Sequence, residues 1–170
     1  AAGEYTEVLK HEPGSPSQWS KFGLQISVNA TVDAMVVAAP SETVSAVNEK
    51  GRVYYYKKIA GVWTLQQTID CPGANQLNFG QRTAMTSDGL YLFISAPNHT
   101  GGLNGIVYAY QLVSGTWVLA SQYTQGVVLD GFGSAMQFNG DQSLMAISAP
   151  NLKRVYIYGV SGSVLTLRKT

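Results

Sequence analysis

The stretch FGSAMQFNGDQSLMAISAPNLKRVYIYGVSGSVLTLRKT, residues 132–170, decides the fold, because the chain carries its pattern three times. The dipeptide Phe-Gly recurs at positions 22–23, 79–80 and 132–133, and Ala-Pro recurs at 39–40, 96–97 and 149–150. Both landmarks are separated by 57 and then by 53 residues. Because both dipeptides follow the same change in repeat length, they indicate a true internal repeat.

Each repeat predicts four short strands separated by turns. The first strand follows Phe-Gly, at residues 24–28, 81–85 and 134–138, and the second is nearly all apolar, at 34–39, 90–96 and 144–149. A strand that is apolar on both faces is typical of a buried position. We therefore expect the second strands near the centre of the molecule. The third strand alternates around tyrosines, at 53–56, 107–110 and 155–158, and the fourth follows across a short hairpin.

These strands predict an all-β, propeller-like fold of three four-stranded antiparallel sheets plus one N-terminal strand. The 170 residues suffice for one domain, with repeats at about 22–69, 79–124 and 132–170, and with residues 4–10 as a fourth-strand segment. Closed propellers use about 4 to 8 blades. The chain therefore belongs to a longer propeller, forms a compact three-unit body, or completes a ring as a homo-oligomer. A β-trefoil-like pseudo-threefold fold is the structural alternative.

The composition excludes several classes of partner. Charged residues make up 12% of the chain, about half of the usual share of roughly 25%, and the formal net charge is +1. We therefore expect no nucleic-acid partner, which would need a basic surface. No apolar run approaches the ~20 residues of a membrane-spanning helix, so we expect no membrane insertion.

The residues that carry enzyme chemistry are scattered. His11 and His99 lie in or beside predicted loops, Cys71 is alone, and no pair of nucleophile and base follows from their spacing. Neither zinc-ligand spacing nor a phosphate-binding glycine loop is present. We therefore expect that the chain is not an enzyme, and a hydrolase built on paired carboxylates is a lesser hypothesis.

The repeat resembles FG-GAP repeats, the unit of integrin-alpha-like β-propellers, and is most similar to their bacterial-type variant. The second repeat shows the pattern as Phe79-Gly80, Ser95-Ala96-Pro97, GIVYAY at 105–110 and Gly-Thr-Trp at 115–117. The resemblance covers nearly the whole chain. It departs from the family pattern at one position: the family has a glycine before Ala-Pro, whereas this chain has Ala38, Ser95 and Ser148.

Family members bind calcium in an Asp-rich turn between the first two strands. Such a site needs several oxygen ligands at alternating positions. The matching turns here hold only Asp33, Asp88 and Asp141, one carboxylate each. We therefore expect no cofactor, with calcium at these three aspartates as the alternative.

Loops on one face of the repeat array are the expected binding surface, because their lengths vary most. Their neutral polar side chains suit a cell-surface receptor or a carbohydrate. Together with the resemblance, they predict an extracellular or virion-surface attachment module, such as a viral spike, used for cell adhesion; a protein scaffold within a larger propeller is the alternative. The candidate ligand-binding residues are Trp19, Asn48, Asp70, Asn75, Asn98, His99, Asn104, Asp130 and Asn151.

Overall fold

A computed structural model describes residues 20–73, 76–99 and 104–169, with side chains described for all of these except 76–77 and 98–99. Regular structure in these ranges is β-sheet, apart from one short 3₁₀ turn, η1 (Pro150–Leu152). No helix in the described ranges has the length and apolar character needed to cross a membrane. The strand expected at residues 4–10 lies outside the described residues, as does His11.

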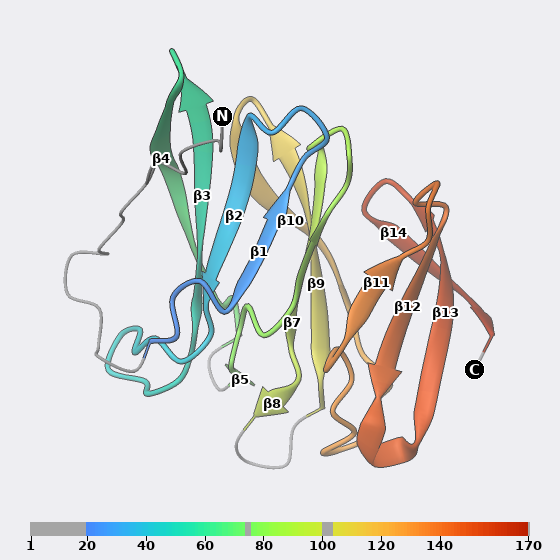
Figure 1. The fold of residues 1–170 in the computed structure, drawn as a ribbon. Coiled ribbons are helices and arrows are strands. Elements are labelled where there is room, and N and C mark those ends of the chain that lie inside the picture. The colour runs from blue at the N-terminus through green and yellow to red at the C-terminus, as the bar shows by residue number, and fades with distance from the viewer. Residues whose placement is uncertain (1–19, 74–75, 100–103, 170) are drawn as a thin grey trace, which may run out of the picture.

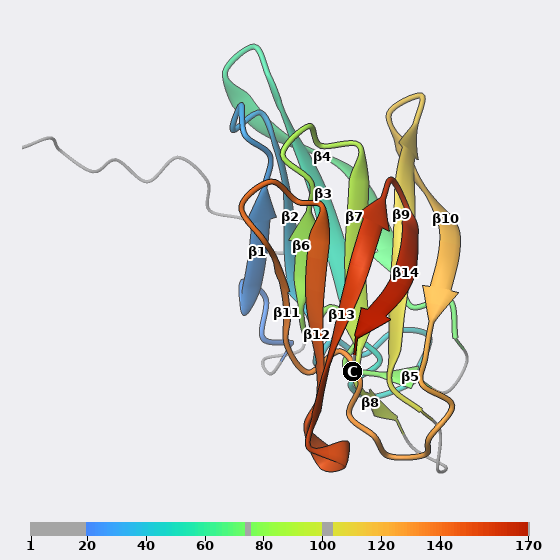
Figure 2. The same cartoon turned by 90° about the vertical axis from the view of Figure 1, so that its right-hand side faces the viewer.

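Three four-stranded antiparallel sheets make up the fold, and each follows the chain order from one edge to the other (Figures 1 and 2). The first sheet contains β1 (Gln25–Val28), β2 (Ala34–Ala39), β3 (Arg52–Ile59) and β4 (Val62–Asp70). The second contains β6 (Thr83–Met85), β7 (Tyr91–Ala96), β9 (Ile106–Val113) and β10 (Thr116–Tyr123). The third contains β11 (Met136–Phe138), β12 (Leu144–Ala149), β13 (Arg154–Ser161) and β14 (Val164–Lys169).

The all-β class with three four-stranded antiparallel sheets is thus confirmed. The described strands close no barrel, in contrast to the β-trefoil alternative, in which strands from all three repeats would share one. One small pairing was not predicted. Strand β5 (Gln76–Leu77), in the segment that joins the first and second sheets, pairs with β8 (Asn98–His99), in the loop between β7 and β9.

The hairpins between third and fourth strands are set by residues that accept positive φ. Ala60 and Gly61 have φ of 49° and 85° in the β3–β4 turn, and Ser114 and Gly115 have φ of 50° and 84° in the β9–β10 turn. Positive φ at both central positions is the requirement of a two-residue type I′ hairpin, whose twist matches that of the strands. A register shift interrupts each of the three pairings between third and fourth strands. Such bulges increase the local twist of a sheet.

Neighbouring sheets pack face to face, and their side chains form the core. Between the first and second sheets lie Val36, Val53, Tyr55, Met85, Leu92, Ile94 and Tyr108, and between the second and third lie Phe93, Val107, Ala109, Met136, Met145, Ile147 and Tyr156. The second strands β2 and β7 are buried on both faces, as expected. In strand β12 buried side chains instead alternate with exposed or half-buried ones, and another described sheet packs on one face of the third sheet only.

The Phe-Gly landmark is the point where each sheet contacts the one before it. A Cβ on Gly80 would lie 2.9 Å from Ala38 Cβ and 3.0 Å from Val53 Cγ2. A Cβ on Gly133 would lie 2.8 Å from Ser95 Cβ and 3.2 Å from a Val107 methyl. Only glycine fits so close to a neighbouring sheet, and both glycines have a φ of +91° that favours glycine as well.

The same glycine also fixes the spacing within its own repeat. In all three repeats its backbone N–H donates a 2.9 Å hydrogen bond to the carbonyl of the residue that precedes Ala-Pro: Gly23 to Ala38, Gly80 to Ser95 and Gly133 to Ser148. Because the two landmarks are bonded to each other, an insertion within either strand between them would shift the pairing, and only the turn that joins the two strands could absorb it. The loops beyond Pro are under no such constraint, and their lengths vary.

The glycine contact leads to a first prediction. Gly133→Ala should lower the free energy of unfolding by about 1–2 kcal/mol through its positive φ, and by about 1–3 kcal/mol more through the clash with Ser95. Gly23→Ala is the matched control, because Gly23 has a φ of +85° but a Cβ there would meet no described atom within 4 Å. Urea denaturation measures both changes. Equal losses in the two variants would contradict the role of close sheet contact.

Candidate functional site

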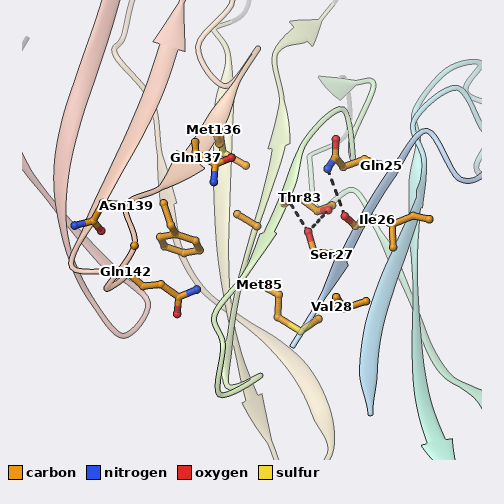
Figure 3. A pocket seen from close by; sticks show the side chains of 13 residues that line it. Gln25, Ile26, Ser27, Val28, Thr83, Met85, Met136, Gln137, Asn139 and Gln142 are labelled. Atoms are coloured by element: carbon orange, nitrogen blue, oxygen red, sulfur yellow. Dashed lines mark hydrogen bonds between the residues drawn. The ribbon is translucent and has the colours of Figure 1, made fainter. Parts of the chain in front are cut away.

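A pocket of about 420 Å³ lies where the first strands of the three sheets come together (Figure 3). Each of β1, β6 and β11 is the edge strand of its sheet, and the turn after β11 completes the wall. The lining residues are Gln25, Ile26, Ser27, Val28, Thr83, Ala84, Met85, Met136, Gln137, Phe138, Asn139, Gly140 and Gln142.

Hydrogen bonds between the sheets hold part of this lining in place. Ser27 Oγ lies 2.8 Å from Thr83 Oγ1 and donates to the Thr83 carbonyl at 3.0 Å, so β1 and β6 are joined across the sheet boundary. Gln142 Oε1 accepts hydrogen bonds from the backbone N–H of Ser87 at 2.8 Å and from its hydroxyl at 3.0 Å. These bonds orient the Gln142 amide beside the space between the strands (Figure 3).

The polar groups of the lining are all uncharged at neutral pH. Amides come from Gln25, Gln137, Asn139 and Gln142 and hydroxyls from Ser27 and Thr83, while no ionisable side chain belongs to the lining. Amides and hydroxyls both donate and accept hydrogen bonds. The pocket can therefore bind a neutral ligand that carries several oxygen atoms, but its lining offers no general base.

Sequence analysis missed these residues, although one signal was present. In the first strands, polar residues such as Gln25, Ser27 and Gln137 alternate with apolar ones, and Ser27 and Gln137 occupy the same position of their repeats, where the second repeat has Ala84. The recurring residues were interpreted as packing, and the variable loops as the binding surface. Polar residues that alternate with apolar ones in the first strand would have been the better guide.

The loops that hold the described candidate binding residues lie apart from this pocket, at the ends of the strands away from the β11–β12 turn (Figure 1). Trp19 and Asn75 lie outside the described residues, and Asn98 and His99 form β8. Asn48 is exposed and accepts a 3.3 Å hydrogen bond from Thr43. Asn104 is half-buried, and Asn151 donates a 2.6 Å hydrogen bond to the Leu129 carbonyl.

Two acidic candidates are engaged by the protein itself. Asp70 accepts hydrogen bonds from Arg52 at 2.5 and 3.1 Å, and Arg52 also contacts Glu42 at 2.9 Å, which in turn accepts from the Tyr54 hydroxyl at 2.7 Å. Asp130 is fully buried, and its Oδ1 accepts from the backbone N–H of Gly105 at 2.9 Å and of Phe132 at 3.0 Å. These contacts fix loops through Asp70 and through Asp130 Oδ1, while Asp130 Oδ2 is buried and has no hydrogen-bond partner among the described residues.

The three aspartates considered for calcium lie in three different turns, each between the first and second strands of its sheet. Asp33 Oδ1 accepts from Asn29 at 2.6 Å and from Thr31 at 2.5 Å, and Asp88 Oδ1 accepts from Thr86 at 2.5 Å. Asp141 Oδ1 accepts from the Asn139 amide at 2.7 Å and from the Ser143 hydroxyl at 2.6 Å. Among the described residues no group of three His, Cys, Asp or Glu side chains comes together.

Comparison with known proteins finds solved structures of similar fold but no related sequence family. No protein-family model matches the sequence, and no curated protein matches it. Two similar structures, from Bacteroides fragilis and Bacteroides uniformis, bear the description "putative 6-phosphogluconolactonase". Their TM-scores are 0.62 and 0.64 and their identities 16% and 12%; each match covers 84% of this chain and 36% and 38% of theirs.

A third similar structure is that of a functionally unknown protein from Desulfotomaculum acetoxidans. Its TM-score is 0.53 at 15% identity, and the match covers 84% of this chain and 41% of the other. The chain therefore spans about two fifths of the length of these proteins. At such identities the likeness shows the fold alone.

These findings correct the expected family. The assignment to FG-GAP repeats was wrong, because no family model matches and the similar structures are lactonase-like proteins of a different fold. The physical reason lies in the residues that carried the resemblance. Phe-Gly and Ala-Pro are the contact points between and within sheets, as Gly80 and Gly133 show, so stacked sheets of other families need similar residues there.

The expected function is corrected as well. The expectation of a non-enzymatic attachment module for a receptor or glycan, with a viral, adhesive or scaffolding role, was wrong, because two of the similar structures are described as putative 6-phosphogluconolactonases. That expectation depended on the absence of catalytic motifs along the sequence. Side chains from separate sheets meet in the pocket without any such motif, so the absence of catalytic motifs was not sufficient to exclude an enzyme.

The turn around Asp141 leads to a prediction about pH. Hydrogen bonds from Ser143 and Asn139 to the carboxylate lower the pKa of Asp141 below its usual 3.8. A lowered pKa in the folded state stabilises the turn above pH 3.8, and this stabilisation is lost as the pH falls through the folded-state pKa. NMR titration should find a pKa below 3.8, and Ser143→Ala should raise it. The pKa of Asp33 is the internal control; a Ser143→Ala spectrum with an unchanged Asp141 titration would contradict the assignment.

Proposed function

We propose that the three sheets, formed by the repeats at about 22–69, 79–124 and 132–170, are consecutive blades of a β-propeller, and that the protein is a hydrolase of small lactones. The face-to-face stacking of four-stranded sheets with all first strands on one side supports the propeller arrangement. The names of two similar folds support the reaction class.

The pocket between the first strands is the observation that carries this proposal. In a propeller, the first strand of each blade lies nearest the central axis, so a pocket lined by β1, β6 and β11 is axial. A lactone presents a carbonyl oxygen, a ring oxygen and, in sugar acids, several hydroxyls. The amides of Gln25, Gln137 and Gln142 and the hydroxyl of Ser27 are suited to bind such oxygen atoms.

The lining favours an uncharged substrate. Proteins usually bind phosphate with arginine, lysine or the N-terminus of a helix. None of these belongs to the lining of this pocket. We therefore propose a neutral hydroxylated lactone as the substrate, in preference to a phosphorylated one.

Hydrolysis of a lactone sets clear requirements for the site. Water adds to the carbonyl carbon, the bond from that carbon to the ring oxygen breaks, and the ring oxygen takes a proton, which gives a hydroxy acid. Hydrogen-bond donors near the carbonyl oxygen stabilise the developing charge, and a general base takes the proton of the water. The side-chain amides of Gln137 and Gln142 are donors of this kind. The lining itself holds no general base, so the proposal requires one from residues of this chain outside that lining.

The proposal is tested by a pH-stat assay of the 170-residue chain with glucono-δ-lactone and its 6-phosphate. We expect hydrolysis above the spontaneous rate, faster for the neutral lactone. Gln137→Leu removes one neutral hydrogen-bonding group, so it should raise KM about 3- to 10-fold.

Gln66→Leu is the matched control, because Gln66 is exposed on β4, away from the pocket, and should leave KM unchanged. Both variants should keep the wild-type circular dichroism spectrum. Acceleration of neither lactone by the wild-type chain would refute the proposed activity. A preference for the phosphorylated lactone would refute the substrate class.

A further inference from the structure

The connection between β10 and β11 carries three consecutive exposed aliphatic side chains. Val127, Val128 and Leu129 are 41%, 59% and 59% exposed. At the same distance before the other two Phe-Gly dipeptides, the sequence reads Ser-Gln-Trp at 17–19 and Ala-Asn-Gln at 74–76. The stacking of the sheets therefore does not require an aliphatic run at this place. We call residues 127–129 the aliphatic tip.

Hydrogen bonds on both sides hold the aliphatic tip in one conformation. The Leu129 carbonyl accepts a 2.6 Å bond from the side-chain amide of Asn151, and Asp130 accepts from the backbone N–H of Gly105 and of Phe132. Leu129 has a φ of 58°, a left-handed conformation that is uncommon for leucine. Strained backbone persists where its surroundings hold it, and such strain is concentrated at binding sites. The tip thus presents its side chains on a fixed turn.

Two cationic side chains lie close to the aliphatic tip. The short turn η1 is bonded to the tip through Asn151, and the exposed Lys153 and Arg154 directly follow η1. Among the described residues, neither cation forms an ion pair. Figure 1 shows the β10–β11 connection and the segment between β12 and β13 at the same end of the molecule, away from the β11–β12 turn.

The charge around the tip is positive. Residues 131–169 hold four cationic side chains and one acidic side chain, which lies in the β11–β12 turn at the opposite end. Asp130, at the tip's own end, is buried. Glu42 and Asp70 are both paired with Arg52. Glu49 is exposed, but it belongs to the loop between β2 and β3 of the first sheet.

We propose that the aliphatic tip, together with Lys153 and Arg154, docks on the surface of an anionic lipid bilayer. The three aliphatic side chains would enter the boundary between headgroups and acyl chains, and the two cations would lie among the anionic headgroups. Such a contact needs no membrane-spanning segment.

The kind of side chain favours lipid over a protein partner. Trp, Tyr and Arg dominate the binding energy of protein–protein contacts, whereas Leu and Val are under-represented there. The docking is also independent of the proposed reaction, because none of residues 127–129, 153 and 154 lines the pocket.

Co-sedimentation of the 170-residue chain with lipid vesicles tests the docking. We expect binding to vesicles of phosphatidylcholine with phosphatidylserine, weaker binding to phosphatidylcholine alone, and a decrease as the NaCl concentration rises. Leu129→Asn removes an aliphatic side chain but keeps a residue that accepts positive φ, so it should weaken binding about 10-fold. Val113→Asn is the matched control and should leave binding unchanged, because Val113 is 48% exposed in the β9–β10 hairpin at the other end of β10.

Two further variants separate the contribution of charge from that of the aliphatic side chains. Lys153→Asn and Arg154→Gln each remove one positive charge, so each should weaken binding to the phosphatidylserine vesicles about 5-fold and leave binding to phosphatidylcholine alone unchanged. Val128→Ser is a second test of the tip that leaves Leu129 in place. All variants should keep the wild-type circular dichroism spectrum.

Three results would overturn the proposal. The first is a wild-type chain that binds no vesicles, and the second is vesicle binding that neither Leu129→Asn nor Val128→Ser weakens. The third is self-association of the chain that Leu129→Asn abolishes, which would assign the tip to a protein contact. Lactone hydrolysis without vesicle binding would overturn the docking and leave the proposed hydrolase standing.

Discussion

The close approach of a glycine backbone to the preceding sheet is the constraint on which the structure depends. Gly80 and Gly133 leave no room for a side chain, and their amides at the same time bind the carbonyl that precedes Ala-Pro. One residue thus sets the distance between sheets and the register within its own sheet. The buried aromatic contacts beside it, Phe79 with Tyr108 and Phe132 with Tyr156, then fill the space that this approach creates.

Much of the fold could be predicted because its determinants recur. The second strands were placed at 34–39 and 144–149, as observed, and at 90–96, where the observed strand begins one residue later. The first strands begin later than expected, at residues 25, 83 and 136, because the residues after Phe-Gly still belong to the turn that seats the glycine. The β5–β8 pairing was missed because its two-residue strands carry no periodic pattern.

The candidate site could not be predicted in the same way. Most of its lining comes from the same positions of the first strand in all three repeats, but the residue types there differ, as Ser27, Ala84 and Gln137 show, and the pocket exists only because the sheets stack. The residues that do recur are occupied by packing, which also made the family resemblance misleading. Conversely, Asp130 looked like a surface ligand in a polar loop, yet it is buried and binds two backbone amides.

The contact at each Phe-Gly also bears on how such a protein grows. Each sheet carries both the glycine that contacts the preceding sheet and the valine that receives the next one. A duplicated gene segment therefore encodes a unit that can pack against the unit from which it was copied. Lengthening the array by one unit then reuses a contact that already exists between neighbouring units. The uneven turns beyond each proline are free to diverge afterwards, since they lie outside the pairing that the duplication must preserve.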